Sequence, residues 1–348
     1  MRVLELFAGI GGVGFGIEAA GHLTTQAVER DEIAAHFYRL NHPHVNVYAD
    51  DIYRVPLEWY KPVDMIWLSP PCTEDSVSKT TGTRNESVAR AGEAFIPILY
   101  HFRDGLQRLP GMVILENVPQ YQSNTSYGAI CAALLKCGYT LQAKIVEMSR
   151  YGIPSSRRRL ILVARLDGAF HWPKPQSPVS WYEATADLIA SYPIRAMPDW
   201  VRSRWHNVKN LPALIDNQVW ENPLCINTQA SKYRQPVLVD GQFSYGKSKE
   251  GQGLTVRAAH QPATCVVASA SSAKMVALGP DAMVRPDGAF YARLMAFPNA
   301  TILPSVKEHA IKLIGNAVPP LFVQRLLEAM TDTSSRSIWS VSLWVGAA

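Results

Sequence analysis

The stretch Met65-Ile66-Trp67-Leu68-Ser69-Pro70-Pro71-Cys72 joins an apolar run to an abrupt stop. The four apolar residues predict a buried strand. Two prolines end it, because proline has no N–H for the next ladder bond and a fixed φ. The cysteine that follows is then held at a strand exit, where open α/β sheets bind ligands. Cys72 is therefore a candidate nucleophile, and an inert buried thiol is the alternative that this stretch alone leaves open.

Strand-like and helix-like segments alternate around this stretch through the first 165 residues. Apolar runs predict strands at 3–7, 24–28, 45–48, 65–68, 112–115, 139–146 and 160–163. Segments of helical periodicity predict helices at 13–20, 33–41, 95–108 and 127–136, and another follows at 321–330. Such alternation is typical of a doubly wound, Rossmann-like α/β sheet.

The composition changes after Ala164, where prolines recur and long apolar runs become rare. We therefore expect a smaller, loop-rich domain at 169–256, inserted between the two parts of a larger domain, 1–168 and 257–330. The final segment, 331–348, is Ser-rich and then apolar, and we expect a tail there.

Bulk composition excludes several classes of protein. Hydrophobic residues make up 47% of the chain and charged residues 18%, which fits a soluble globular protein. No apolar run is long enough to span a membrane, and the N-terminus lacks the pattern of a signal peptide. The five cysteines are scattered without a CxxC pair, which argues against a zinc site or a disulfide framework. We expect reduced thiols, a cytoplasmic location, no bound metal and no membrane partner.

Positive charge is concentrated in one part of the chain, although the net charge is only +5. Five arginines fall between residues 150 and 165, and further Lys and Arg residues, interleaved with Trp and Tyr, continue to Arg257. Basic groups contact phosphates and flat rings stack on bases, so the pattern predicts a nucleic-acid-binding face. A solvated basic surface with ordinary core aromatics is the alternative that composition leaves open.

Glycine and carboxylate motifs follow several of the predicted strands. Phe7-Ala8-Gly9-Ile10-Gly11-Gly12 lies between a strand and a helix, where glycines let the backbone approach a ligand and the helix N-terminus favours an anion. Glu29 could accept hydrogen bonds from ribose hydroxyls, and Asp51 from an adenine amino group. Together these groups predict a nucleoside-shaped ligand. Glu116 is a candidate proton donor at another strand end, with a capping or salt-bridged carboxylate as the alternative.

Five blocks, taken in chain order, resemble the motifs of the C5-cytosine methyltransferases. They are the glycine block at 7–12, Pro70-Pro71-Cys72, Glu116-Asn117-Val118, Gly152-Ile153-Pro154 with Arg157 and Arg159, and Gly315-Asn316-Ala317-Val318-Pro319. The resemblance covers nearly the whole chain except 169–256 and the tail, and blocks in this order are a specific signal. It implies a methyltransferase sheet that binds S-adenosylmethionine, and it makes the loop-rich domain a target-recognition domain.

The resemblance also implies a function, namely a DNA (cytosine-5)-methyltransferase that acts on a cytosine flipped out of double-stranded DNA. Its catalytic residues would be Cys72 as the nucleophile, Glu116 as the proton donor, Arg159 at the base and Arg157 near the nucleic-acid backbone or the loop. We expect a monomer. The cofactor-binding residues would be Phe7, Gly9, Ile10, Gly11, Gly12, Glu29, Asp51, Ile52, Pro70, Asn316 and Val318.

Two further expectations concern contacts with DNA. The polar, partly basic segment 73–92 is expected to close over the flipped base. Side chains of the target-recognition domain are expected to enter the major groove and to read base edges or contact phosphates. The candidates are Arg195, Arg202, Arg204, Gln229, Lys232, Arg234 and Lys247.

The chain departs from the family's pattern at a few positions. Thr73 and Asp75 replace a glutamine and an aromatic residue after the cysteine, and Ser155 replaces the glutamine of the arginine block. Two acids beside the thiol, Glu74 and Asp75, would oppose thiolate formation unless they point to solvent. Two alternative functions remain: a tRNA cytosine-5 methyltransferase, whose Cys-Phe-Thr insertion we do not find, and a non-catalytic paralogue that binds S-adenosylmethionine or DNA.

Overall fold

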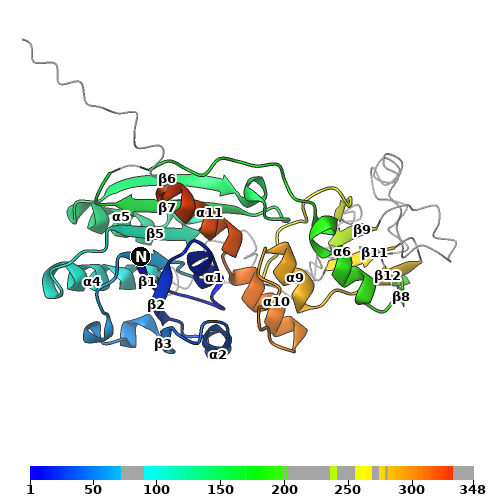
Figure 1. Cartoon of the computed structure of the whole chain (residues 1–348), viewed down its shortest axis with the longest axis horizontal. Coiled ribbons are helices and arrows are strands. Elements are labelled where there is room, and N and C mark those ends of the chain that lie inside the picture. The colour runs from blue at the N-terminus through cyan, green and yellow to red at the C-terminus, as the bar shows by residue number, and fades with distance from the viewer. Residues whose placement is uncertain are drawn as a thin grey trace, which may run out of the picture.

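Two sheets organise the part of the chain that the computed structural model describes (Figure 1). The described residues are 1–71, 90–168, 170–199, 201, 236–240, 255–268, 274–278 and 281–331. The large sheet contains β1 (Arg2–Leu6), β2 (Leu23–Val28), β3 (Asn46–Tyr48), β4 (Met65–Leu68), β5 (Met112–Asn117), β6 (Thr140–Glu147) and β7 (Arg158–Arg165). The second contains β8 (Arg195–Ala196), β9 (Val237–Asp240), β10 (Thr255–Arg257), β11 (Lys274–Ala277) and β12 (Ala282–Val284).

Helices connect these strands at almost every predicted position. They are α1 (Gly12–Ala19), α2 (Glu32–Asn41), α4 (Phe95–Tyr100), α5 (Thr125–Lys136), α6 (Trp181–Ser191), α9 (Gly288–Leu294), α10 (Lys307–Asn316) and α11 (Pro320–Thr331). Short helical turns lie at Ile52–Arg54, Leu57–Trp59, Ala91–Ala94, His101–Gly105, Pro119–Ser123 and Met148–Tyr151. Polar residues begin several of these helices: Asp31 caps α2 and Asn124 caps α5, because their side chains accept from the first free N–H groups.

The strand order of the large sheet is β3-β2-β1-β4-β5-β7-β6. β1 to β5 run parallel, and β7 and β6 complete the sheet in antiparallel pairing. The chain leaves β1 toward β2 on one side and later returns to β4 on the other, so the order reverses beside β1. Ligands of doubly wound sheets bind outside the carboxyl ends of the strands at such a switch point. The predicted doubly wound α/β fold is confirmed.

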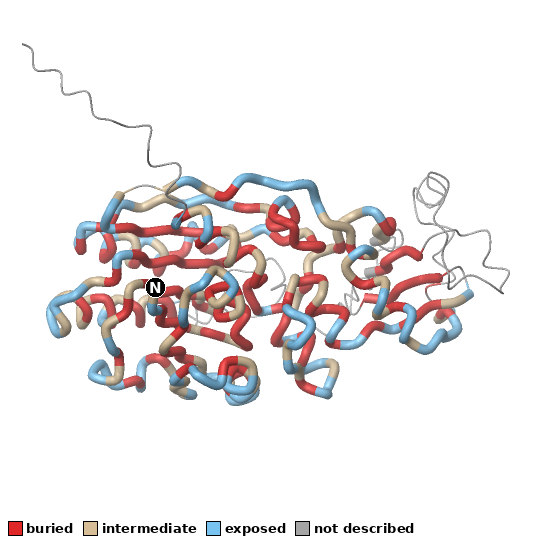
Figure 2. The backbone as a smooth tube through the Cα atoms, in the orientation of Figure 1, coloured by how far each residue is buried: buried red, intermediate tan, exposed pale blue. Residues whose placement is uncertain are grey.

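The central strands are buried on both faces, which is why they read as continuous apolar runs. All four residues of β4 and all six of β5 are buried, as the red strands in Figure 2 show. Alternate residues serve opposite faces: Ile66 packs in one core with Phe95 of α4, whereas Trp67 packs in another with Phe322 of α11. The second face is closed by α11 on α1, where an added Cβ at Gly16 would strike the Val323 side chain.

One helix differs from its prediction. A single helix over 95–108 was expected, but α4 ends at Tyr100 and continues as a π-helical turn, His101–Gly105. Leu106 N donates to His101 O, and Gln107 then takes a φ of 50°, which ends the helix before Arg108. Apolar periodicity continues through such a turn, so the pattern alone does not reveal it.

The second sheet is antiparallel, in the order β10-β9-β11-β12-β8. It lies at the other end of the molecule from β6, beyond α9 and α10 (Figure 1). The predicted domain boundary at residue 256 falls inside it, since β10, β11 and β12 belong to the same sheet as β8 and β9. These strands have only two to four residues, too few to show a periodicity. The division of the chain into domains stays a prediction.

The described residues contain neither a membrane-spanning helix nor a cluster of metal ligands. No helix among them is long and apolar enough to cross a membrane. No group of three or more His, Cys, Asp or Glu side chains in the same ranges is arranged to hold a metal ion.

Candidate active site at the carboxyl edge of the large sheet

The residues that follow β4, Ser69 to Pro71, are held in place from two sides. Cys72 and residues 73–89 lie outside the described residues, but the approach to them is visible up to Pro71. Ser69 N donates to Leu6 O of the neighbouring strand at 3.2 Å. The indole N–H of Trp67 donates to Ser69 Oγ at 3.1 Å. The residues before Cys72 are therefore fixed to the end of β1.

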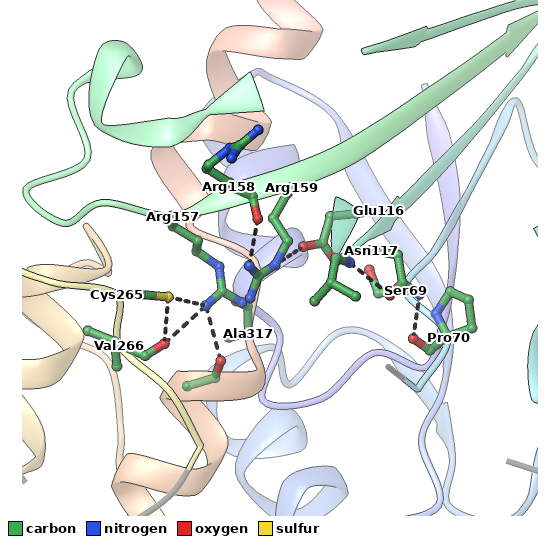
Figure 3. Close-up of polar contacts among 12 residues, drawn as sticks. Ser69, Pro70, Glu116, Asn117, Arg157, Arg158, Arg159, Cys265, Val266 and Ala317 are labelled. Carbon is green, nitrogen blue, oxygen red and sulfur yellow. Dashed lines mark hydrogen bonds and ion pairs between the residues drawn. The ribbon is translucent and has the colours of Figure 1, made fainter. Parts of the chain in front are cut away.

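Asn117, at the end of β5, fixes the same exit from the other side. Its side-chain amide donates to Pro70 O at 3.0 Å, and its side-chain oxygen accepts from Val118 N at 2.8 Å (Figure 3). The side chain is buried. A buried amide with both functions satisfied has one orientation. Asn117, which the sequence analysis did not place among the site residues, thus sets the position of the backbone two residues before Cys72.

Glu116 and Arg159 form a buried ion pair between β5 and β7. Arg159 Nε lies 3.1 Å from Glu116 Oε1, and the two side chains are 14% and 6% exposed (Figure 3). Arg159 also donates from Nη1 to Arg158 O at 2.7 Å, which holds the guanidinium in place. The predicted proton donor and the predicted base-contacting arginine are therefore neighbours at the carboxyl end of β5, on the same edge as Pro70.

Arg157 makes a different set of contacts from those expected. The side chain is only 2% exposed and donates to Val266 O at 3.1 Å, to Gly315 O at 3.2 Å and to Ala317 O at 2.9 Å. These bonds clamp the closing motif around Asn316 against the arginine block (Figure 3). The geometry gives Arg157 a positioning role, and a direct contact with nucleic acid stays a prediction.

The glycine block forms a turn with three residues in the left-handed region. Phe7 has a φ of 60°, Gly9 of 59° and Gly11 of 91°. Gly9 N donates to Glu29 Oε2 at 2.8 Å, which ties the turn to the end of β2. A Cβ built on Gly9 would meet nothing within 4 Å, so this glycine faces open space. Ile10, by contrast, is fully buried in the core.

The other two glycines of the block face protein. A Cβ on Gly11 would lie 2.5 Å from His42 Nε2, and a Cβ on Gly12 would overlap the carbonyl oxygen of Val318. Glycine is therefore required at both places for packing, and Val318 belongs to the site through its backbone. All three glycines are predicted to let the backbone approach a ligand, but of the three only Gly9 has open space around its Cβ position.

Glu29 is a carboxylate whose oxygens can accept further hydrogen bonds. Its two oxygens accept from Gly9 N at 2.8 Å and from Asp31 N at 2.7 Å. A carboxylate offers about four lone-pair sites, so two acceptor positions remain for other donors. Burial raises the pKa of Glu29, and the two backbone donors oppose that rise.

The structure also describes three other predicted cofactor residues, Asp51, Ile52 and Asn316. Asp51 accepts from Tyr53 N at 3.1 Å, lies 3.8 Å from the Arg30 guanidinium, and begins the short helical turn that buries Ile52. Asn316 is the last residue of α10 and is exposed. Among the predicted DNA-reading residues, Arg195 lies exposed in β8, and the other six fall outside the described residues.

The edge thus combines a glycine turn joined to a strand-end carboxylate, at β1 and β2, with an acid–arginine pair at β5 and β7, and β4 lies between the two. A family model described as C-5 cytosine-specific DNA methylase matches residues 1–332. The chain belongs to the C-5 cytosine-specific DNA methylase family, so the predicted family and cofactor are confirmed.

Two sequence relatives and one solved structure are similar to this chain. M.NgoPII, a Type II methyltransferase of Neisseria gonorrhoeae, is 26% identical over 353 residues, with 97% of each chain covered. The tRNA (cytosine(38)-C(5))-methyltransferase of Rattus norvegicus is 29% identical over 198 residues, 56% of this chain and 47% of the rat protein. The chain thus matches about half the length of that relative. The S. pombe Dnmt2 methyltransferase structure has a TM-score of 0.62 at 19% identity, with 95% of this chain and 98% of that one covered, and shows the fold.

The observed geometry fits S-adenosylmethionine. Gly9 has open space where a side chain would project, and the adjacent Glu29 carboxylate keeps acceptor positions that two ribose hydroxyls could fill. The N-terminus of α1 begins beside the same turn and favours a carboxylate. Phe7, Glu29 and Asp51 would hold the nucleoside part, and the turn would hold the amino-acid part.

Proposed function

We propose that this chain is a DNA (cytosine-5)-methyltransferase, which methylates C5 of a flipped-out cytosine in double-stranded DNA through a covalent bond from Cys72 to C6. The observation that supports this most is the arrangement at the ends of β4 and β5. There the Glu116–Arg159 pair and the Asn117 bond to Pro70 lie on the strand exits that lead to Cys72.

The proposed chemistry begins with the thiolate. C5 of cytosine is a weak nucleophile, and addition of the Cys72 thiolate to C6 converts it into an enamine carbon. The S–C6 bond forms while the C5=C6 electrons shift toward N3, where Glu116 in its protonated form supplies the proton and becomes a carboxylate beside Arg159. Arg159, fixed beside Glu116, donates to the O2 atom of the base and balances charge there. The cofactor, when bound, supplies an electrophilic methyl group to C5.

The second half of the reaction restores the base. A water removes H5, the electrons of that C–H bond re-form C5=C6, and the S–C6 bond breaks to return the Cys72 thiolate. The N3 proton returns to Glu116, so the enzyme ends in its starting state. None of these groups reaches a base inside a duplex, which is why the cytosine must first be flipped out.

Similarity along the whole chain supports DNA as the substrate. The Neisseria relative, a Type II methyltransferase, aligns over 97% of this chain. We further propose that double-stranded DNA binds along the second sheet and the segment between β8 and β10, with the enzyme acting as a monomer. Exposed Arg195 is the described member of the proposed base-reading set.

A tRNA substrate is the second candidate, because the rat relative that modifies tRNA is 29% identical over 56% of this chain. The chain lacks the Cys-Phe-Thr insertion expected of that group. A matched pair of substrates separates the two candidates: a DNA duplex and a tRNA, each with 5-fluorocytosine at the target position. Fluorine blocks removal at C5, so an active enzyme stays covalently attached.

The proposal predicts an adduct of the wild-type chain with the DNA duplex and none with Cys72→Ser. An adduct with tRNA alone would move the chain to the tRNA enzymes. The absence of any adduct, in a folded chain that still binds S-adenosylhomocysteine, would contradict the proposed activity and leave a non-catalytic paralogue.

A further inference from the structure

Ser155 is the residue of the arginine block at which the chain departs from the family's glutamine. Its side chain is completely buried, and its hydroxyl donates to the carbonyl oxygen of Leu294 at 2.8 Å. Leu294 is the last residue of α9 and stands 139 residues further along the chain. Buried polar groups require hydrogen-bond partners, and this one finds its partner in a distant element. The bond therefore ties the arginine block to α9.

The backbone around Ser155 is paired with a part of the chain that belongs to the second sheet. Residues 258–268, here called the connecting segment, follow β10 and precede β11. Ala263 N donates to Pro154 O at 2.9 Å, and Ser156 N donates to Ala263 O at 2.8 Å. The two chains thus form a short parallel bridge, which joins the arginine block to the connecting segment.

The connecting segment is itself held from two sides. On one side, the indole N–H of Trp181 in α6 donates to Ala258 O at 2.7 Å. On the other side, an added Cβ at Gly315 of the closing motif would overlap the backbone of Val267 and Ala268. Backbone lies directly on backbone there, so no flexible side chain can absorb a shift of the segment. The arginine block is therefore paired with a segment whose own position is fixed.

Side chains at alternate positions of the arginine block form a row along the catalytic edge. Ser155 and Arg157 are buried and the Arg159 side chain is 14% exposed, whereas Arg158 between them is exposed. In an extended chain, side chains two residues apart lie on the same side. Arg157 bonds the connecting segment and the closing motif, and Arg159 pairs with Glu116 (Figure 3). Ser155 is thus the first anchor of the row that ends at the ion pair.

The pairing of this chain with β6 begins only after Ser155. Met148 N donates to Arg157 O at 2.8 Å, and the ladder to β6 continues from Arg158. Ahead of Arg157 the chain leaves β6, and its partners there include Ala263 and Leu294. Loss of the Ser155 hydroxyl would therefore loosen the arginine block at the point where the large sheet no longer supports it.

We propose that Ser155 is a positioning residue for the reaction, whose bond to Leu294 sets the arginine block so that Arg159 meets the base in the orientation that turnover requires. This inference rests on the proposed function, in which Arg159 donates to O2 of the flipped cytosine. Ser155 is completely buried and does not reach the base itself. Its loss should therefore lower the rate of methyl transfer and leave the binding of DNA and cofactor nearly unchanged.

The test is steady-state kinetics of methyl transfer to duplex DNA by the full-length chain, with two pairs of proteins. The wild type is compared with Ser155→Ala, and Ser155→Thr with Ser155→Val, so that each pair differs by the hydroxyl. Loss of the hydroxyl should lower kcat about tenfold in each pair, because a small displacement of a positioned group can cost about one to two orders of magnitude in rate. The KM for DNA and the Kd of S-adenosylhomocysteine should change by about twofold or less.

Thr185→Val is the matched control. Thr185 is also completely buried, and its hydroxyl donates to Trp181 O at the same distance, 2.8 Å, within α6. The variant loses a buried hydroxyl-to-carbonyl bond outside the arginine block, so its kcat should stay at the value of the wild type. Equal kcat within both pairs, or a loss in Thr185→Val as large as in Ser155→Ala, would overturn the inference. A Ser155→Ala variant that loses DNA affinity and keeps kcat would overturn it as well.

Nitrogen-15 NMR of the arginine side chains gives a second readout that needs no substrate. The Nε–H signal of Arg159, assigned by its loss in Arg159→Lys, reports the ion pair with Glu116. This signal should move in Ser155→Ala and keep its position in Thr185→Val. An unmoved signal in Ser155→Ala would contradict the inference. A folded wild-type chain that forms no covalent adduct with the 5-fluorocytosine duplex would instead contradict the proposed function, whatever the arginine signals show.

Discussion

The two halves of the carboxyl edge are built from different kinds of contact. The cofactor half comprises the turn at 7–12 and Glu29, at the ends of β1 and β2. There backbone N–H groups donate to one carboxylate, and Gly12 lies against the backbone carbonyl of Val318. The base half comprises Pro70, Glu116 and Arg159, at the ends of β4, β5 and β7. There polar side chains form an ion pair with one another and hydrogen bonds with the backbone.

This difference determines how each half fails. A side-chain contact is lost when one residue changes, and its buried partner is left without compensation. A backbone contact survives most substitutions and is lost only when the main chain is forced out of its path. We therefore expect the base half to be sensitive to substitutions that remove a charged or polar group, and the cofactor half to be sensitive to substitutions that add side-chain volume.

The largest expected effect belongs to the base half. Glu116→Gln cannot supply the proton to N3, and turnover should fall about 10²- to 10⁴-fold, the usual contribution of a general acid. Turnover is measured as the rate of methyl transfer from labelled S-adenosylmethionine to DNA. Affinity for S-adenosylhomocysteine, a property of the cofactor half, should stay unchanged. An equal loss of affinity and turnover would show that the two halves are not independent.

Arg157→Met should have the next largest effect, on stability. The substitution removes the arginine hydrogen bonds to the carbonyls of Val266, Gly315 and Ala317, of which Val266 O still accepts from the Cys265 thiol, and an unsatisfied buried group costs about 1–3 kcal/mol. We expect the free energy of unfolding in urea to fall by about 3–5 kcal/mol. Arg158, the neighbouring exposed residue, provides a matched control. Arg158→Met should change the free energy of unfolding by about 0.5 kcal/mol or less. If Arg157→Met lost activity while its free energy of unfolding stayed unchanged, Arg157 would contact the nucleic acid and would not hold the closing motif.

Glu5→Gln tests the buried carboxylate behind the cofactor half. Burial raises the pKa of Glu5 to about 7, so the folded chain holds its proton more tightly than the unfolded chain. Wild-type stability should therefore fall as the pH rises from about 4.5 to about 7, by about 2–3 kcal/mol. The amide keeps an oxygen for Tyr38 and Thr24 but has no proton to lose. Urea unfolding at pH 5 to 8.5 should show this slope in the wild type only, and parallel curves would refute the assignment.

A pair of alanine substitutions gives the smallest expected effects and divides the cofactor half itself. Gly12→Ala forces a methyl group against the Val318 carbonyl and should cost about 1–3 kcal/mol of stability. Gly9→Ala adds a methyl group in open space at a φ of 59°, which should cost about 1–2 kcal/mol. Its larger effect should be on S-adenosylhomocysteine affinity, measured by calorimetry. Equal losses of affinity in both variants would show that Gly12 also faces the cofactor.

The sequence was sufficient to predict the features that depend on local chemistry. The strand Met65–Leu68 has the predicted bounds, because a run buried on both faces must be apolar and two prolines must end it. The order of motifs identified the family for the same reason, since each motif is a short loop between elements of regular pattern.

The features that escaped prediction depend on residues distant in the sequence. The carbonyls that Arg157 clamps come from segments 109 to 160 residues further along the chain, and no local pattern marks them. The ring of His42 lies 3.0 Å from the carbonyl oxygen of Gly11, which stands 31 residues earlier in the chain. Gly11 and Gly12 read as ligand-facing because glycine looks the same whether the space beside it holds a cofactor or a carbonyl. In these cases only the tertiary structure distinguishes the two roles.

The packing of α1 on α11 has a consequence for synthesis of the protein. The turn formed by the first dozen residues is completed by the Val318 carbonyl, and Gly16 rests against Val323. The turn at residues 7–12 therefore cannot reach its final packing until residues 318–323 have been synthesised. A chain synthesised only as far as α9 lacks this packing around the turn that is proposed to hold the methyl donor, so binding of the donor is expected only after α11 has formed.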